Sequence, residues 1–220
     1  FVGANRLSGT VPSEFRNLTL LRKLTVLGNE RLSGRLEWLL DLLPTDLEIL
    51  NAGGTAISGS IPSTVGTKFT RLQSFEVYSN KVTGTVPSEI GLLSTLLKLS
   101  LFSNWLHGSI PSEIGRLSRL QVFEMDENRL TGTIPTEVGE LMSCEGFDVF
   151  ENNLSGTIPT VVGRLSMLKF LALDANNLSG TVPSELGQAS SLIGLELSSN
   201  QLNGTLPSEL GLLGSATHLG

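Results

Sequence analysis

The chain has 220 residues with a formal net charge of −6 at pH 7, and 40% of its residues are hydrophobic. The acidic balance argues against a nucleic-acid ligand, because proteins bind phosphate backbones through basic surfaces. The sequence contains no run of about 18 apolar residues that would predict a transmembrane helix. We therefore expect any contact with a membrane to involve segments outside this chain. The single cysteine, Cys144, can form no internal disulfide.

The first 80 residues contain repeats of irregular length. The repeat glycines between residues 34 and 84 are 25 residues apart. Residues 35–43 carry helix-forming side chains without Gly or Pro, and Glu37 stands where later repeats have Pro. We therefore expect a longer helix in this segment. In the next repeat, Thr55 takes the position that later repeats give to Asn.

From residue 80 onward the repeats become regular. An asparagine recurs every 24 residues, followed four positions later by Gly and seven positions later by Pro. These asparagines are Asn80, Asn104, Asn128, Asn152, Asn176 and Asn200. A strict period of this length predicts a solenoid, in which each repeat packs mainly on its neighbours. A buried Asn at each turn would satisfy backbone groups where the chain leaves a strand.

The residues of one unit predict its local structure. Leu99 and Leu101 are separated by the polar Ser100, which indicates a short strand with one face inward. A Gly-Thr-Ile-Pro or Gly-Thr-Val-Pro segment follows, and then a Ser-Glu-Ile-Gly stretch, whose Ser and Gly suggest the cap and the end of one short helical turn. Stacked units would pair their strands in parallel, about 4.8 Å apart. Cys144 lies where other repeats have Leu, which predicts a buried side chain rather than a reactive thiol.

The whole pattern, L-x-x-L-x-L-x-x-N-x-L-x-G-x-I-P-x-x-I/L-G-x-L, resembles the plant-type leucine-rich repeat over essentially the entire chain. That repeat is familiar from ectodomains of receptor-like kinases and receptor-like proteins, and from polygalacturonase-inhibiting proteins. The resemblance implies an α/β fold, a right-handed leucine-rich-repeat solenoid with a parallel β-sheet on the concave face and short helical or 3-10 turns on the convex face. We expect residues 1–220 to form a single domain of about nine 24-residue repeats, truncated at both ends because the family's capping repeats are absent.

The same resemblance implies a non-catalytic recognition module that binds a protein or peptide ligand on its concave face, without a cofactor. The full-length protein would be a cell-surface receptor or a secreted binding protein, extracellular or anchored at the cell surface; an intracellular scaffold is an alternative, because the family's cysteine-bearing caps are missing. In a secreted protein, glycans would be carried by Asn17, Asn153, Asn177 and Asn203. The two histidines are far apart in sequence and no metal-ligand or Ser-His-Asp set stands out, which argues against an enzyme.

The outward positions of the predicted strands place one residue per repeat in columns across the concave face. Tyr78 and Phe102 are neighbours in one column, and Phe150 follows two repeats later. Beside them, Glu124 would face Asp148 across adjacent strands. Like charges placed opposite each other destabilise a sheet, so this pattern indicates either a surface for a basic or aromatic-bearing partner or a solvated acidic face. The candidate ligand-binding residues are Glu76, Tyr78, Phe102, Glu124, Asp126, Glu127, Asp148, Phe150, Glu151 and Asp174.

A hydroxyl-bearing residue follows the repeat glycine in most units. These residues are Thr10, Ser60, Thr85, Ser109, Thr133, Thr157, Thr181 and Thr205. Stacked units would place them in a row at strand-like spacing, which suggests ice or a crystal surface as an alternative ligand. One hydroxyl per repeat makes a line, however, whereas a plane that matches ice would need parallel rows. The simpler interpretation is that Thr favours a second extended strand.

Overall fold

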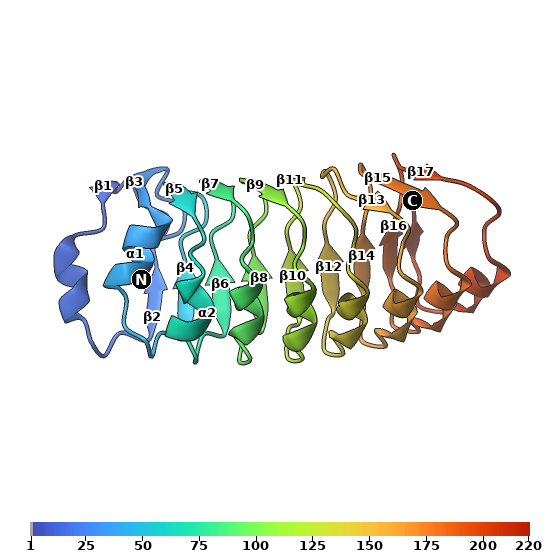
Figure 1. The fold of residues 1–220 in the computed structure, drawn as a ribbon, viewed down its shortest axis with the longest axis horizontal. Helices are drawn as coiled ribbons and strands as arrows, with labels where there is room; N and C mark the ends of the chain where they lie inside the picture. The colour runs from blue at the N-terminus through green and yellow to red at the C-terminus, as the bar shows by residue number, and fades with distance from the viewer. Residues whose placement is uncertain (1) are drawn as a thin grey trace.

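The computed structural model describes residues 2–220, and Phe1 lies outside the described residues. The chain winds into one elongated, right-handed stack of coils, from the N-terminal coil at one end to the C-terminal coil at the other (Figure 1). Each regular coil contributes a strand, an Asn turn, a second short extended segment and a helical turn. This is the leucine-rich-repeat solenoid that the repeat pattern predicts.

Within residues 2–220, nine parallel strands form the main sheet, which is the concave face of the solenoid. Its strands are β2 (Lys23–Thr25), β4 (Ile49–Asn51), β6 (Ser74–Glu76), β8 (Lys98–Ser100), β10 (Val122–Glu124), β12 (Gly146–Asp148), β14 (Phe170–Ala172), β16 (Gly194–Glu196) and β18 (His218–Leu219). The register follows the repeat, so that Glu76, Ser100 and Glu124 lie opposite one another on successive strands. Equivalent positions of each unit therefore form true columns across the sheet.

A second set of short parallel strands runs along the upper edge of Figure 1. One sheet contains β1 (Ser8–Thr10), β3 (Arg31–Arg35), β5 (Ala56–Ser60), β7 (Lys81–Gly84), β9 (Trp105–Gly108) and β11 (Arg129–Leu130), and another contains β13 (Ser155–Gly156), β15 (Asn177–Gly180) and β17 (Gln201–Leu202). The register here is displaced along the strand from coil to coil, because Ser60 pairs with Thr83 and Thr133 with Ser155. The residues after the repeat glycines are thus not direct partners in this pairing.

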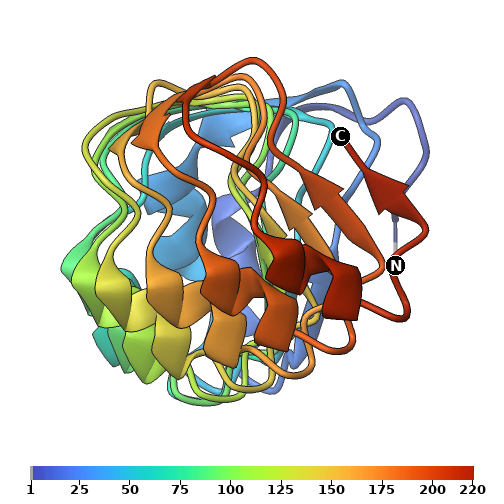
Figure 2. The same cartoon turned by 90° about the vertical axis from the view of Figure 1, so that its right-hand side faces the viewer.

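Helical turns cover the side of the stack away from the main sheet (Figure 2). Two are α-helical, α1 (Leu36–Leu42) and α2 (Thr64–Lys68). The others are 3-10 turns: η1 (Ser13–Asn17), η2 (Ser88–Leu92), η3 (Ser112–Arg116), η4 (Thr136–Glu140), η5 (Thr160–Arg164), η6 (Ser184–Gln188) and η7 (Ser208–Leu212). The predicted short helical or 3-10 turns on the convex face are confirmed.

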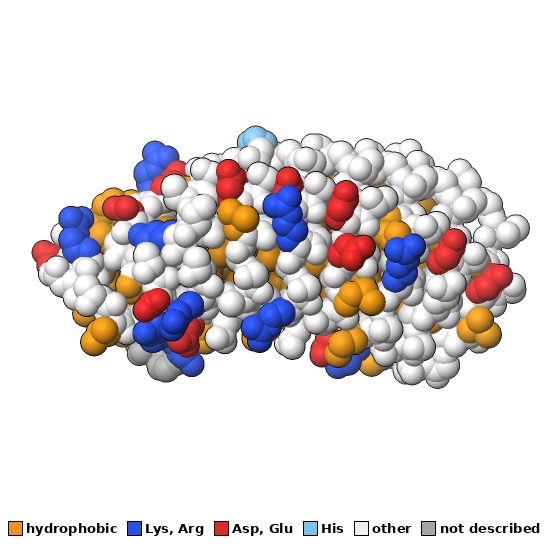
Figure 3. All heavy atoms as spheres, turned by 60° about the horizontal axis from the view of Figure 1, so that its bottom comes forward, with side chains coloured by type: hydrophobic (Ala, Val, Ile, Leu, Met, Phe, Trp, Pro, Cys, Tyr) orange, Lys and Arg blue, Asp and Glu red, His pale blue; other side chains and the backbone are white. Residues whose placement is uncertain are grey.

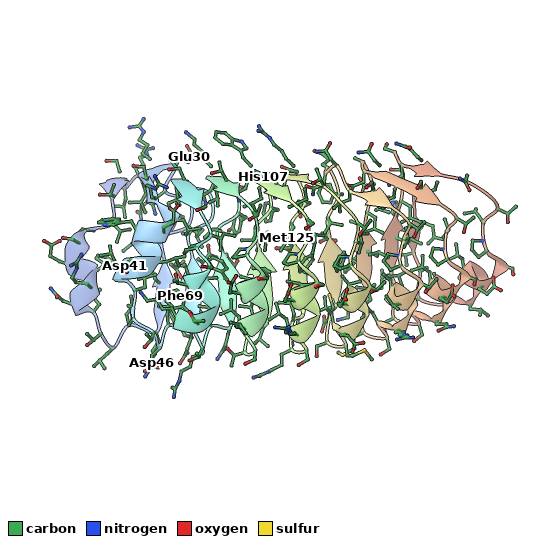
Figure 4. All side chains as sticks on the ribbon, in the orientation of Figure 1. Glu30, Asp41, Asp46, Phe69, His107 and Met125 are labelled. Atoms are coloured by element: carbon green, nitrogen blue, oxygen red, sulfur yellow. The ribbon has the colours of Figure 1, made fainter. Side chains whose placement is uncertain are left out.

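Apolar side chains from every coil fill the space between the sheet and the helical turns. Phe123 and Phe147 of neighbouring coils are buried, and their rings stack with centroids 4.7 Å apart. Met125 and Phe69 lie inside the same continuous core (Figure 4). Burying one such side chain contributes about 1.5–3 kcal/mol. The prediction that Cys144 is buried is confirmed, and that burial raises the pKa of its thiol to about 12, with Asp148 adding to the shift.

The helical turns start and stop for reasons that differ from those predicted from their Ser and Gly residues. Pro87 is the N-cap of η2, no side chain caps that turn, and the Ser88 hydroxyl lies 3.3 Å from the Glu89 carboxylate instead. Gly91 lies inside η2 rather than after it. A Cβ at Gly91 would overlap the backbone of Glu113 in the next coil, so this glycine allows adjacent helical turns to approach each other.

The longer helix expected at residues 35–43 is present as α1, and it is tied to the following coil through Glu37. The Glu37 carboxylate accepts hydrogen bonds from the backbone N–H and the hydroxyl of Ser60 at 2.9 and 2.8 Å, and from Arg35 at 3.0 Å. Burial opposes ionisation, yet these bonds lower the pKa of Glu37 to about 2. In the next irregular coil, Thr55 replaces Asn by donating its hydroxyl to the carbonyl of Ala52 at 3.1 Å.

Candidate functional site

Three columns of outward-facing residues cover the middle of the concave face. The middle column consists of Glu76, Ser100, Glu124, Asp148, Ala172 and Glu196. The aromatic column, two residues later on each coil, consists of Tyr78, Phe102, Asp126, Phe150 and Asp174. The first column, at the start of each strand, consists of Ser74, Lys98, Val122, Gly146, Phe170 and Gly194. The columns predicted from the sequence do not include this first one. Because inward-facing and outward-facing residues alternate along a strand, the residue two positions before each middle-column residue also faces outward.

Two of the predicted aromatic residues form a single platform. The rings of Tyr78 and Phe102 stack with centroids 4.6 Å apart and an angle of 7° between their planes. Tyr78 lies directly over Gly53, where a Cβ would overlap the ring. The small residue in the irregular coil therefore makes room for the platform. Phe150 is not part of it, since it lies beyond Asp126 in the aromatic column, beside a separate cavity of about 400 Å³.

A lysine outside the predicted set alters part of the predicted acidic group. Lys98 Nζ lies 3.4 Å from a carboxylate oxygen of Glu76 and 3.7 Å from one of Glu124. Ser74 donates a further hydrogen bond to Glu76 at 2.6 Å. On the same strand as Lys98, the hydroxyl of Ser100 is fully buried and has no hydrogen-bond partner among residues 2–220. One ammonium thus lies between two carboxylates and offsets one of their two negative charges.

Asp126 and Asp148 are the carboxyl groups of this face whose pKa values are raised most. Asp126 is 6% exposed, and burial raises its pKa to about 7, with contributions from the charges of Asp148, Glu124 and Glu127. Burial likewise raises the pKa of Asp148 to about 6, with contributions from Glu124 and Asp174. Within residues 2–220, no cationic side chain forms a salt bridge with either of them. The structure therefore brings two unpaired carboxylates together beside Phe150.

The remaining predicted site residues lie at the edge of this group. Glu127 and Glu151 are exposed and occupy left-handed backbone positions, with φ of 51° and 48°, just before the buried asparagines. Glu127 accepts a hydrogen bond from the hydroxyl of Ser103. Asp174 is half-buried in the aromatic column. On the lower side of the molecule, by contrast, Lys and Arg side chains are interspersed with Asp and Glu along the long axis (Figure 3).

The edge formed by the second strands is a different kind of surface. Hydroxyls of residues before the repeat glycines donate to the glycine carbonyl of the preceding coil, as Thr83 does to Gly59 at 3.1 Å and Ser179 to Gly156 at 3.3 Å. The methyl group of Thr85, after its glycine, lies against Gly108 of the next coil. His107 interrupts this surface at the upper edge of Figure 4. All four asparagines of the glycosylation sequons are exposed: Asn17, Asn153, Asn177 and Asn203.

Two further features bear on chemistry at these surfaces. Among residues 2–220, no group of three or more His, Cys, Asp or Glu side chains is placed to hold a metal ion. The part of the chain that the structure describes also contains no helix that is both long and apolar enough to cross a membrane.

Comparison with known proteins agrees with the repeat architecture. The Leucine Rich Repeat family model matches residues 191–213. The chain is similar to the plant peptide hormone receptor RGFR1, solved in complex with RGF2, at 37% identity and a TM-score of 0.94 over 99% of this chain and 35% of that one. It is equally similar, at 37% identity and a TM-score of 0.94, to the ectodomain of the plant membrane receptor kinase GASSHO1/SCHENGEN3 from Arabidopsis thaliana, solved in complex with CASPARIAN STRIP INTEGRITY FACTOR 2, over 99% of this chain and 26% of that one.

A plant ice-binding protein shares the fold as well, at 25% identity and a TM-score of 0.74, over 97% of this chain and 78% of that one. No curated protein matches the chain in sequence. The chain spans 35% and 26% of the two receptor chains it resembles. By its repeats and its fold, the chain forms a leucine-rich-repeat solenoid that resembles the ectodomains of plant receptor kinases.

Proposed function

We propose that this chain is a non-catalytic recognition module that binds a peptide or protein ligand on its concave face. The observation that carries the proposal is the stacked Tyr78–Phe102 platform, which stands on that face beside the unpaired carboxylates of Asp126 and Asp148. Aromatic side chains commonly supply the anchor contacts of interfaces. The similarity to receptor ectodomains solved with peptide ligands supports the same function.

The binding surface we propose comprises the ten residues predicted from the sequence together with Lys98 and Phe170 of the first column. The aromatic residues supply apolar contacts, and the carboxylates attract a basic partner. Ligand binding here would need no cofactor and no covalent chemistry. We also propose that residues 1–220 belong to one leucine-rich-repeat domain of an extracellular or cell-surface protein.

Loss of the aromatic platform tests this assignment directly. A synthetic peptide library would be screened against the 220-residue chain, and the affinities of the selected peptides measured by calorimetry. Phe102→Ala should weaken binding by about thirtyfold, the equivalent of about 2 kcal/mol, if the ring is a buried anchor. Trp105→Ala is the matched control, because Trp105 is an exposed aromatic residue on the second strands. Equal effects of the two substitutions would refute binding on the concave face.

The carboxylates should act mainly on the rate of encounter. Glu124→Gln combined with Asp148→Asn should slow association with a basic peptide and flatten its dependence on salt, because long-range charge acts on diffusion toward the site. Glu113→Gln with Glu137→Gln on the helical turns is the control pair. Stopped-flow association rates at several salt concentrations would be compared between the concave-face variant and the control variant. Unchanged rates in the concave-face variant would show that the acidic group does not steer the ligand.

Glycosylation at the exposed sequons would support the proposed extracellular location. Expression through a eukaryotic secretory pathway, followed by mass spectrometry of glycopeptides, would show whether Asn17, Asn153, Asn177 and Asn203 are modified. Asn153 and Asn177 lie on the side of the second strands. Glycans there would leave the concave face open, which is compatible with peptide recognition. Failure of the secreted chain to acquire any glycan would contradict this part of the proposal.

Ice binding is a second candidate, favoured by the similarity to a plant ice-binding protein. The second strands carry hydroxyls both before and after the repeat glycines, and the glycine carbonyls fix the orientation of those before them. Thermal hysteresis of the unglycosylated chain tests this candidate, with Thr157→Lys and Thr181→Lys expected to abolish it and Phe102→Ala to leave it intact. Absence of hysteresis would dismiss ice binding. Glycans at Asn153 and Asn177 would also obstruct the ice-binding surface.

A further inference from the structure

The concave face contains a hollow that is separate from the Tyr78–Phe102 platform. It arises over Ala172, the smallest residue of the middle column, and its volume is about 400 Å³. Ala172 lies directly between Asp148 and Glu196, the opposite residues on the two neighbouring strands. Because adjacent strands are about 4.8 Å apart, the backbones of these two acidic residues are separated by about 10 Å across the hollow.

Aromatic rings form the apolar walls of this hollow. Phe150 and Phe170 both line it, and Phe170 is 51% exposed on a strand of the sheet. The Phe170 ring lies against Gly194, where a Cβ would come within 3.1 Å of it. An alanine and a glycine thus leave space at positions where other coils carry larger side chains. The result is a cavity with aromatic sides, with Asp148 and Glu196 on the two strands that flank it.

The two carboxylates differ in their partners. The Glu196 carboxylate lies 2.8 Å from Nε2 of His218 and against Gly220, on the side of β16 away from Ala172. Asp148 forms no salt bridge within residues 2–220, since the neighbouring cations Lys98 and Lys169 pair with Glu124 and Glu145 instead. An unpaired carboxylate at the mouth of an apolar cavity is costly unless a cation arrives to pair with it. The hollow is therefore complementary to a positively charged group with an apolar stem.

We infer that this hollow is the docking site for one arginine side chain of the ligand, with its guanidinium on the Asp148 carboxylate and its plane against Phe150 or Phe170. Arginine fits better than lysine because a planar guanidinium stacks on aromatic rings and donates to both oxygens of one carboxylate, whereas an ammonium is a compact, strongly hydrated charge. An apolar side chain would fill the cavity but leave Asp148 unpaired. This inference rests on the proposed recognition function, because it names the chemistry of the ligand on the same face.

The test uses a small probe in place of the unidentified ligand. N-acetyl-arginine methylamide would be titrated into the ¹⁵N-labelled chain at about pH 7.5 and low salt, with the uncharged citrulline analogue, the lysine analogue and the phenylalanine analogue in parallel. We expect saturable shifts at the amides of Phe170, Ala172 and Gly194 with the arginine probe. Equal binding of the citrulline or phenylalanine analogue would overturn the inference, and tighter binding of the lysine analogue would overturn the preference for guanidinium.

Two variants and their matched controls locate the site. Asp148→Asn should weaken the arginine probe by about tenfold, as expected for loss of one charged hydrogen-bond partner. Ala172→Leu should abolish binding because it fills the hollow. Glu113→Gln removes a carboxylate on η3, away from the concave face, and Thr25→Leu enlarges the position of Ala172 in β2. Binding that is unaffected by Asp148→Asn and Ala172→Leu, or weakened as much by the controls, would place the probe elsewhere.

The pH dependence gives a second readout. The affinity for the arginine probe should rise from about pH 5 to about pH 7.5 as Asp148 ionises, since its pKa in the free chain is about 6. The charged or titratable groups around it are Glu124, Asp126, Cys144, Asp174, Glu196 and His218. Most of the rise should be absent from Asp148→Asn. A rise of the same size in that variant would mean that another group controls binding.

The outcomes separate this inference from the proposed function. A selected peptide that requires Phe102 but is unaffected by Asp148→Asn and Ala172→Leu would overturn the arginine site and leave concave-face recognition intact. If the arginine probe binds in the hollow and no selected peptide depends on the platform, the arginine site stands and peptide recognition by the platform is overturned. The Phe102→Ala variant should bind the arginine probe normally, because the hollow lies several strands away from Phe102.

Discussion

At the scale of single residues, the buried asparagines connect neighbouring coils. The side-chain amide of Asn128 donates to the carbonyls of Leu101, Met125 and Asp126 at 3.0, 3.2 and 3.0 Å. Its oxygen accepts from the backbone N–H of Leu106 at 2.9 Å. Leu101 and Leu106 belong to the preceding coil, so one side chain satisfies the turn of its own coil and of its neighbour. The recurrence of Asn every 24 residues follows from this geometry.

Removing one of these asparagines should therefore destabilise the whole stack. Asn128→Ala leaves several buried backbone groups unpaired and should lower the free energy of unfolding by about 2–4 kcal/mol. Asn5 is the matched control, since it occupies the same repeat position but is exposed and, among the described residues, bonds only within its own turn. Asn5→Ala should change stability by less than about 0.5 kcal/mol. Urea denaturation of the two variants measures the difference, and similar losses would contradict the bridging role.

Asp126 predicts a specific dependence of stability on pH. Its pKa is raised to about 7, chiefly by burial, so the folded chain holds a proton that the unfolded chain has already released above about pH 4. Stability should consequently fall as the pH rises from about 4 to 7 and then level off, and Asp148 contributes in the same direction. Asp126→Asn should remove much of this fall.

The measurement is thermal unfolding from about pH 4 to about pH 8. We expect Asp126→Asn to match the parent chain near pH 4 and to exceed its stability at pH 8 by about 1–2 kcal/mol, after allowance for solvent screening. Asp41→Asn, at an exposed position on α1, is the control and should change little across the range. A variant that is less stable than the parent at pH 8 would show that the Asp126 carboxylate is stabilised in a way this structure does not contain.

At the scale of elements, the glycine of each helical turn controls how closely the coils stack. In η3, a Cβ on Gly115 would overlap the carbonyl oxygen of Glu137 in the next coil. In η7, Gly211 occupies the same repeat position, and a Cβ there would have no neighbouring atom of residues 2–220 within 4 Å. The two glycines have the same local sequence role but different surroundings, which makes them a matched pair.

Substitution by alanine should have opposite effects at these two sites. Gly115→Ala forces η3 and η4 apart and should cost about 1–3 kcal/mol. Gly211→Ala should be neutral or stabilise the chain by about 0.4–1 kcal/mol, because it restricts the unfolded chain without a clash. Chemical denaturation of both variants provides the comparison. If Gly115→Ala is as benign as Gly211→Ala, close stacking of the helical turns is not what requires glycine.

The elements also show what a sequence of this kind can predict. The position of each main-sheet strand and of each buried Asn follows from the repeat, whereas α1 follows from the helix-forming residues that replace the repeat pattern at 35–43. The partners of outward-facing residues do not follow from it. Lys98 has a long side chain that can reach several carboxylates, so the sequence does not show that it pairs with Glu76 and Glu124. The displaced register of β5 and β7 depends on how the second strands tilt. Both arise only when the coils are placed in space.

The candidate site can be predicted only in part for the same reason. Tyr78 and Phe102 are identifiable as neighbours because their column is set by the 24-residue period. The hollow over Ala172 is not, since it results from the absence of side-chain volume at Ala172 and Gly194 rather than from any recognisable motif. Phe170 is not predicted because the two inward-facing residues of its strand, Leu171 and Leu173, do not show that the strand begins at Phe170, one residue before Leu171. Small residues on an otherwise crowded face are thus as informative as the large ones.

At the scale of the whole molecule, the stack is a one-dimensional array in which each coil is covered by the next. The C-terminal coil lacks that cover on one side. Leu206 is 80% exposed, whereas Ile158, at the same repeat position two coils earlier, is 2% exposed. Leu212 is 70% exposed, and an apolar cavity of about 380 Å³ opens beside Leu206 and Leu219. Exposed apolar surface of this kind promotes association.

The isolated 220-residue chain should therefore self-associate through this end. Sedimentation velocity at tens of micromolar should reveal dimers or larger species, which Leu206→Asp with Leu212→Lys should weaken by about tenfold or more through loss of apolar contact area. Leu92→Lys is the control, because Leu92 holds the repeat position of Leu212 in an internal coil and is 44% exposed there. That variant should associate like the parent chain. A parent chain that stays monomeric at about 100 micromolar, or a control that also dissociates, would show that the uncovered coil end is not the surface through which copies meet.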